Sequence, residues 1–200
     1  MGAITSRSLV SLVLFFLVLC FSPGTLTSSH SSAPVEFIRA SCGATRYPAL
    51  CVECLKAYAP TVRRSPRKLA RTALTVTADR AQSASTFVSR FNAGSNSARS
   101  KETGAVQDCI ETMRDSVDGL RRSVREMRRM GRARSNRFRW HLDNVQTWVS
   151  AALTDQSTCL DSLDQNASSR LRAAIRKKVV EVSQLTSNAL ALVNRLDPTN

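Results

Sequence analysis

Proline is missing from a long stretch of this chain. Of the six prolines in 200 residues, five lie at or before Pro66 and the sixth is Pro198. Glycine is also scarce between these two prolines, where only four occur: Gly94, Gly104, Gly119 and Gly131. A proline inside a helix costs roughly 3 kcal/mol. So long a run without helix-breaking residues predicts that residues 67–197 are largely helical.

The chain also lacks an apolar run long enough to span a bilayer, which takes roughly 20 residues. The longest run holds thirteen mostly apolar residues, Leu9 to Phe21, after a single arginine and before Ser-Pro-Gly-Thr. A charged start, an apolar middle and a polar end are typical of a secretory signal peptide. We therefore expect residues 1–28 to be removed, with the cut between Gly24 and Ser32, and the mature chain to be secreted without a membrane span. An uncleaved anchor is the alternative.

Acidic side chains are few, since 15 Asp and Glu stand against 29 Lys and Arg for a net charge of +14. Such a charge suggests nucleic acid in the nucleus, but export argues against that partner. An exported chain meets acidic polysaccharide, lipid headgroups and acidic protein surfaces instead. The densest cluster has nine arginines and one acid, Glu126: Arg121, Arg122, Arg125, Arg128, Arg129, Arg132, Arg134, Arg137 and Arg139. We expect a basic patch there, with an ordinary solvated basic face as the alternative.

Apolar residues recur at steps of three and four in three segments, which is typical of helices packed at shallow angles. These stripes are Val106, Ile110, Met113, Val117, Leu120, Val124 and Met127, then Phe138, Leu142, Val145, Val149 and Ala152, then Leu171, Ile175, Val179, Val182, Leu185, Ala189, Leu192 and Leu196. A fourth segment, residues 66–91, has a weaker stripe through Leu69, Ala73, Val76 and Phe87, which Arg80 and Ser83 interrupt.

Four long helices with short links predict an all-α, up-down-up-down four-helix bundle over residues 65–197. Ser65, Ser135 and Asp164 are the expected N-caps of the first, third and fourth helices. Residues 35–62, broken by Pro48 and Pro60, form a short N-terminal segment before the bundle. A coiled-coil oligomer is the alternative architecture, but it would need longer uninterrupted helices.

Five cysteines stay after the signal peptide leaves with Cys20. Cys109 lies about 23 residues before the second bundle loop and Cys159 about 25 after it, so both climb roughly 35 Å and finish level on antiparallel helices. That geometry favours a disulfide between them. Cys42 and Cys51 would then clamp the hairpin, which leaves Cys54 as a free thiol. A redox pair, a metal site and other pairings are alternatives.

Side chains for catalysis are scarce as well. The two histidines, His30 and His141, lie far apart without metal-ligand spacing. No Ser/His/Asp or Cys/His grouping, Gly-rich phosphate loop or paired acid cluster can be assembled. The sequence therefore predicts a protein that is not an enzyme and holds no cofactor or metal.

Three stretches, "CGATRYPALCVECL", "QDCIETMRDSVDGL" and "WHLDNVQTWVSAALTDQSTCLDSL", closely resemble the plant invertase/pectin methylesterase inhibitor family. The resemblance runs from about Phe37 to Leu196. It implies a disulfide-clamped hairpin and a four-helix bundle, with the pairs Cys42–Cys51 and Cys109–Cys159; Cys54 departs from the family's four-cysteine pattern. It also implies a cell-wall protein that inhibits pectin methylesterase or invertase by forming a stoichiometric complex. Because the loop "MGRARSNRFRWH" lacks the Pro-Lys-Phe stretch of the invertase branch, pectin methylesterase is favoured.

In the methylesterase branch, bundle helices dock across the substrate cleft of the enzyme. The expected contact residues flank the core stripe of the third helix: Gln146, Thr147, Ser150, Ala151 and Thr154. Asp115 and Asp118 on the second helix are weaker candidates. The alternative is that these residues pack against a neighbouring helix, Ala151 first among them. The arginine cluster could hold acidic pectin or steer the chain to the enzyme, and Asn166 begins a glycosylation sequon. A polysaccharide-binding module without inhibitory activity is the rival function.

Overall fold

The computed structural model describes residues 33–92 and 100–197, which belong to one compact unit, 32–200. The expected signal peptide, 1–28, lies outside the described residues. The described elements are all helical: α2 (Ala33–Cys42), α3 (Pro48–Leu55), the 3-10 turn η1 (Lys56–Tyr58), α4 (Ala59–Val62), α5 (Pro66–Asn92), α6 (Ser100–Arg129), α7 (Asn136–Asn166) and α8 (Ser169–Asn194). No helix within these ranges combines the length and apolarity that crossing a bilayer requires.

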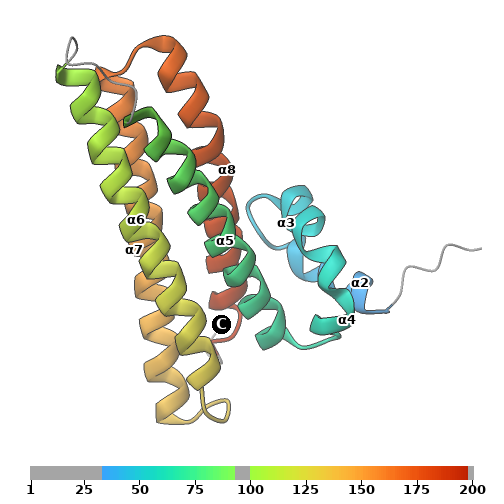
Figure 1. Ribbon diagram of the computed structural model, residues 1–200. Helices are drawn as coiled ribbons and strands as arrows, with labels where there is room; N and C mark the ends of the chain where they lie inside the picture. The colour runs from blue at the N-terminus through green and yellow to red at the C-terminus, as the bar shows by residue number, and fades with distance from the viewer. Residues whose placement is uncertain (1–32, 93–99, 198–200) are drawn as a thin grey trace, which may run out of the picture. The chain divides into compact units, whose positions relative to one another are not determined.

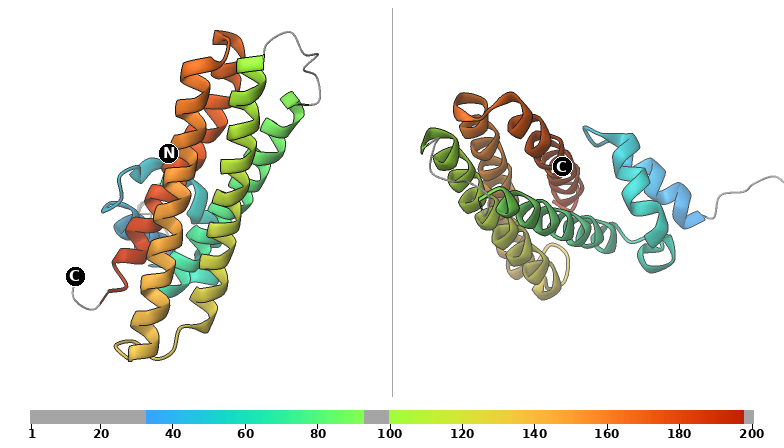
Figure 2. Two further views of the ribbon diagram at one scale, coloured as in Figure 1. Left: turned by 90° about the vertical axis from the view of Figure 1, so that its left-hand side faces the viewer. Right: turned by 45° about the horizontal axis from the view of Figure 1, so that its top comes forward.

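The predicted four-helix bundle and the preceding helical hairpin are confirmed. The long helices α5, α6, α7 and α8 run alongside one another (Figures 1 and 2), and each packs against two others. Helix α6 lies between α5 and α7, and α8 closes the bundle against α5 and α7. The short helices α2, α3 and α4 lie beside α5 and α8.

Two of the three expected caps are present. The Oγ of Ser65 accepts a hydrogen bond from the backbone N–H of Lys68 (3.3 Å), and the Oγ of Ser135 accepts one from that of Phe138 (3.1 Å). The third prediction, Asp164, is wrong because α7 continues through it to Asn166. No residue that disfavours helix interrupts the chain at Asp164, so the turn comes only at residues 167–168.

The three strong stripes form the core as predicted. Every one of their residues is buried except Leu171 and Leu196, which are half-buried. The weak stripe of α5 is confirmed at Leu69 and Ala73 but not at Val76 and Phe87, which are only half-buried. Arg80 and Ser83, which interrupt the stripe, are exposed. The buried face of α5 consists instead of small residues with a few larger ones: Leu69, Ala70, Ala73, Leu74, Ala78, Ala81, Ala84 and Val88. Alanine contributes only one methyl group to a hydrophobic stripe, so the sequence marks this face poorly.

Helices α6 and α7 pack closely at two levels, Gly119 and the disulfide at Cys109. A Cβ on Gly119 of α6 would lie 3.1 Å from the backbone oxygen of Trp148 of α7. The disulfide Cys109–Cys159 joins the same two helices, with the Cα atoms 4.1 Å apart. Between these points, Gln156 of α7 is fully buried, and its Nε2 donates to the hydroxyls of Ser116 (2.8 Å) and Thr186 (3.0 Å). Covalent and polar links thus fix α7 against both of its neighbours.

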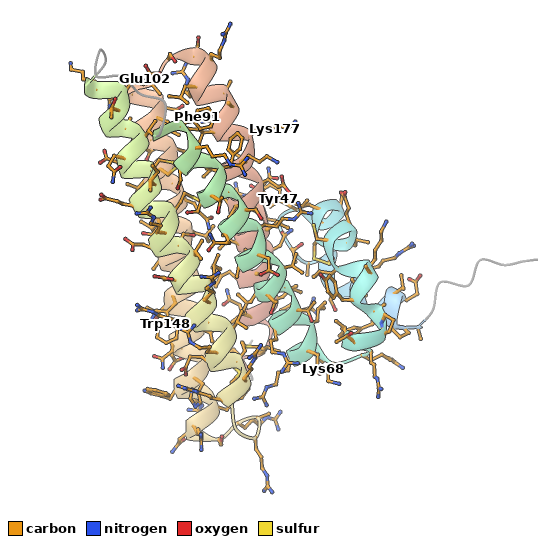
Figure 3. The ribbon with its side chains drawn as sticks, in the orientation of Figure 1. Tyr47, Lys68, Phe91, Glu102, Trp148 and Lys177 are labelled. Atoms are coloured by element: carbon orange, nitrogen blue, oxygen red, sulfur yellow. A yellow bond between two sulfur atoms is a disulfide. The ribbon has the colours of Figure 1, made fainter. Side chains whose placement is uncertain are left out.

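The hairpin is held on the bundle by polar contacts as well as by its own clamp. The disulfide Cys42–Cys51 joins α2 to α3, as predicted. The buried side chain of Asn188 of α8 makes two hydrogen bonds of 2.9 Å with the backbone of Tyr47, one in each direction. Figure 3 labels Tyr47 where the hairpin meets the bundle. Cys54 is the free cysteine of the described residues, half-buried on α3, and burial raises the pKa of its thiol.

Candidate functional site

Helix α7 carries most of the candidate contact residues, and its sequence fixes which side they occupy. Its buried side chains recur at helical spacing along one side: Phe138, His141, Leu142, Val145, Val149, Ala152, Gln156, Cys159 and Leu163. The cap at Ser135 sets its start, and the disulfide at Cys159 fixes it near its end. Since rotation about the helix axis is prevented, the opposite side of α7 is a defined, outward-facing surface.

Four of the candidates lie on this outward face of α7. Thr147, Ser150, Ala151 and Thr154 are all exposed. The hydroxyl of Thr154 donates to the backbone oxygen of Ser150 (3.3 Å), so it is partly satisfied within the helix. Small side chains with few unmet hydrogen bonds leave a smooth surface that another protein can approach closely.

Gln146 does not belong to this free face. Its side chain is half-buried, and its Nε2 donates to the Oδ1 of Asn194 of α8 (3.1 Å). The alternative, in which Ala151 is the first of the candidates to pack against a neighbouring helix, does not hold, because Ala151 is exposed and the buried residue is Ala152. Ala152 lies beside Gly119, where α6 packs closely on α7.

The two acidic candidates of α6 face different neighbours. Asp115 lies close enough to Asp155 of α7 to affect its ionisation. Asp118 lines a groove between α5 and α6, together with Arg114 and Arg121. Only Asp115 therefore borders α7, and Asp118 lies toward the other side of α6.

Sequence reasoning missed two residues beside the outward face. Burial, and secondarily the negative charge of Asp115, raises the pKa of the half-buried Asp155. Trp148, labelled in Figure 3, is half-buried where α7 meets α6. Both residues fall one position away from a core or contact candidate, so spacing alone could not distinguish them from either group.

The nine arginines of the basic patch are all exposed around the turn between α6 and α7. Arg67 at the start of α5 reaches the same turn, since it donates to the backbone oxygens of Gly131 (3.0 Å), Met127 (3.5 Å) and Met130. Burial lowers the pKa of this guanidinium. The contact brings the basic start of α5 to the end of α6.

The acid within this patch points inward. Glu126 and His141 are both buried, and the Oε2 of Glu126 contacts the Nδ1 of His141. Arg129 contacts the other carboxylate oxygen at 3.5 Å. The sequence offers no signal for this pair, because the two residues are fifteen positions apart on different helices.

Two further predictions, the absence of a metal and the glycosylation of Asn166, are not tested by the contacts of the described residues. Within residues 33–92 and 100–197, no group of three or more His, Cys, Asp and Glu side chains is placed to hold a metal ion. Asn166, the first residue of the sequon, is exposed at the end of α7. Its side chain donates to the backbone oxygen of Ser162 at 3.3 Å.

A family model, relatives in sequence and solved structures all match the folded unit of this chain. The family model described as plant invertase/pectin methylesterase inhibitor matches residues 36–192. "Pectinesterase inhibitor 9" of Arabidopsis thaliana is 46% identical over 187 residues, covering 90% of this chain and 92% of that protein. A "21 kDa protein" of Daucus carota is 42% identical over 171 residues, covering 84% and 88%. A crystal structure of a mutant pectin methylesterase inhibitor from Arabidopsis shares the fold, with a TM-score of 0.61 and 20% identity over 82% of this chain and 97% of that one. This chain therefore belongs to the plant invertase/pectin methylesterase inhibitor family.

Proposed function

We propose that this protein is a secreted inhibitor of a plant pectin methylesterase and that it catalyses no reaction itself. The observation that carries the proposal is the 46% identity to Pectinesterase inhibitor 9 across 90% of this chain. In the cell wall, the protein would form a 1:1 complex with the enzyme and limit the removal of methyl esters from pectin.

The outward face of α7 is the surface that we assign to the enzyme. Thr147, Ser150, Ala151 and Thr154 let a partner approach closely, since none of their side chains is long. Helix α7 is tied to α6 by a disulfide and to α8 by the buried Gln156. A rigid helix loses little conformational entropy on docking, which favours affinity.

The edge of α7 that borders α6 supplies an aromatic side chain and negative charge, which the outward face lacks. Half-buried aromatic side chains contribute strongly to many protein interfaces, so Trp148 is the expected anchor beside the small residues. Asp115 and Asp155 add negative charge on the same α6–α7 edge. This combination supports insertion of α6 and α7 into a cleft, where they would exclude the polysaccharide.

Titration of a plant pectin methylesterase with the purified secreted chain tests this function. Esterase activity should fall linearly and end near one inhibitor per enzyme, and light scattering after gel filtration should give the mass of a 1:1 complex. If the esterase is unaffected and an invertase is inhibited instead, the chain belongs functionally to the other branch of its family.

The surface assignment has its own matched test. Thr154→Arg places a long charged side chain on the outward face and should weaken esterase inhibition at least about tenfold. Thr75→Arg on α5 is the control, because Thr75 is also exposed and also donates to the backbone oxygen one turn earlier, at 3.0 Å. Equal inhibition by the two variants would contradict the assignment to α7 while leaving inhibition itself intact.

A further inference from the structure

The arginines at the α6–α7 turn carry almost no compensating charge. All nine are exposed, and among the described residues only Arg129 has a carboxylate partner, Glu126. The nearest flanking acids in sequence, Asp118 and Asp143, form no ion pair within the described ranges. Arg63, Arg64 and Lys68 at or just before the start of α5 are exposed as well, and Figure 3 labels Lys68 toward the end of the bundle that holds this turn.

The fold keeps this charge uncompensated by burying Glu126. Only 6% of Glu126 is exposed, because its carboxylate faces His141 inside the bundle. An acid placed among nine arginines would normally neutralise part of the surface. Here the carboxylate is turned inward to His141, and Arg129 is the one arginine of the basic patch that contacts it.

An exposed indole directly follows the last arginine of the basic patch in the sequence. Trp140 is 61% exposed, and besides Tyr58 it is the only large hydrophobic side chain exposed among the described residues. Its ring packs edge-on against His141, with the centroids 4.8 Å apart and the planes at 71°. His141, which also contacts the buried Glu126, therefore borders the indole, and Trp140 follows Arg137 and Arg139 near the start of α7.

We propose that this end of the bundle, Trp140 with the arginines of the basic patch, binds an acidic polysaccharide of uronate rings, namely de-esterified pectin. A guanidinium pairs with a carboxylate through two parallel hydrogen bonds. An exposed indole stacks on the apolar C–H face of a sugar ring. A linear polyanion meets several arginines at once, so contacts that are individually weak add up.

A polysaccharide fits this surface better than a membrane does. Binding to a bilayer surface requires a sizeable apolar face that enters the headgroup region. Trp140 is the one exposed aromatic residue next to the basic patch, and residues 121–139 include no exposed large hydrophobic side chain. Charge with a single stacking platform suits carboxylated sugars.

Polysaccharide binding requires no contact with the enzyme and goes beyond the proposed inhibition. Its consequence for inhibition rests on that proposed function. Removal of methyl esters exposes carboxylates, so the product of the esterase would retain the inhibitor where the reaction has already advanced. The outward face of α7 around Thr154 would remain free for the enzyme.

Calorimetric titration of the full secreted chain with polygalacturonate, without any esterase present, tests the proposal. Binding should weaken steeply with added salt. Highly methyl-esterified pectin, which has the same rings with masked carboxylates, should bind at least about tenfold more weakly. The variant R132Q/R134Q/R137Q/R139Q should raise the Kd for polygalacturonate about tenfold, since it removes four charged contacts.

The matched control removes the same charge from the other end of the bundle. K101Q/R170Q/K177Q/K178Q alters four exposed residues, one in the first turn of α6 and three in the first three turns of α8, and should change the Kd less than about twofold. Trp140→Ala should weaken binding of polygalacturonate severalfold but leave binding of polyglutamate, which has carboxylates without rings, unchanged. Circular dichroism should show that all variants keep the helical fold.

Three results would overturn the proposal. The first is an equal loss of polygalacturonate binding in the two quadruple variants. The second is a W140A variant that binds both polyanions as tightly as the parent does. The third is tighter binding to phosphatidylserine vesicles than to polygalacturonate. Because no enzyme is present, each of these outcomes is independent of whether the chain inhibits an esterase.

Discussion

Arg63 adopts a backbone conformation that side-chain-bearing residues rarely occupy. Its φ is 55° and its ψ is −113°, where it ends α4 just before α5 begins. A residue with a Cβ is strained in this region, whereas glycine enters it freely. The strain is local to the link between the hairpin and the bundle.

Arg63→Gly should therefore raise the free energy of unfolding by about 1 kcal/mol, because relief of strain exceeds the entropy that glycine adds to the unfolded chain. Urea unfolding monitored by circular dichroism gives the value. Arg64→Gly is the control, since Arg64 is also exposed and does not have a positive φ. It should bring no gain, and an equal gain in both variants would point to reduced charge repulsion instead.

Asp155 couples stability to pH. Its pKa lies above the ordinary 3.8, first through burial and then through the charge of Asp115. The folded chain therefore binds more protons than the unfolded chain just above pH 3.8. The contribution of this group to stability falls as the pH rises through its raised folded-state pKa, and it does not return at higher pH.

Asp155→Asn removes the ionised form of this side chain and should raise the melting temperature at pH 7. The free energy of unfolding should rise by less than about 1 kcal/mol, because the site is partly solvated. The difference in free energy of unfolding between the variant and the parent should vanish below about pH 3.8, where the parent carboxyl is protonated in both the folded and the unfolded state. The gap should also shrink in an Asp115→Asn background. A gap that is constant from pH 3 to pH 7 would contradict this account.

At the scale of the helices, Gly119 sets how closely α6 and α7 pack. Gly119→Ala should destabilise the protein by about 1–2 kcal/mol, since the new methyl group meets the backbone of Trp148 and the helices must separate. Gly104→Ala is the matched control on the same helix, because a Cβ there meets nothing within 4 Å. Better helix propensity should stabilise that variant by about 0.5–1 kcal/mol. Calorimetry gives the melting temperatures of the two variants. Similar shifts from the parent in both would show that packing at Gly119 is loose.

The start of α8 is basic, although cations disfavour the N-terminal end of a helix dipole. Arg172 and Arg176 explain part of this pattern, because both contact the carboxylate of Asp164 near the end of α7, at 3.8 and 3.0 Å. Asp164 therefore links α7 to α8 across the turn from inside α7. The prediction that Asp164 is the N-cap of α8 is wrong, and its contact with α8 is this pair of ionic interactions.

At the scale of the whole molecule, the two disulfides should differ in their contribution to stability. On the chain-entropy relation, the loop of 50 residues closed by Cys109–Cys159 contributes ~4 kcal/mol and the loop of 9 closed by Cys42–Cys51 about 2.5 kcal/mol. The double variant C109S/C159S should thus melt at a lower temperature than C42S/C51S. The opposite order would mean that the hairpin stabilises the bundle more than the bridge between α6 and α7 does.

The contact surface shows where sequence reasoning reaches its limit. Thr147, Ser150, Ala151 and Thr154 are exposed as spacing suggested, yet Gln146 is bound to α8. A residue at the boundary of a helical stripe can face solvent or a neighbour after a rotation of a few tens of degrees. Spacing along one helix does not contain that rotation.

The sequence by itself determined the helices, most of the core and the cysteine pairs. Breakers, caps and apolar period are local properties, and two helices of known length that run antiparallel bring Cys109 and Cys159 level. Only the tertiary structure decided the alanine-rich buried face of α5, the inward turn of Glu126 toward His141 and the exposure of Trp140. Each depends on how one helix is rotated and spaced against the next, and the close packing of all four sets that geometry together.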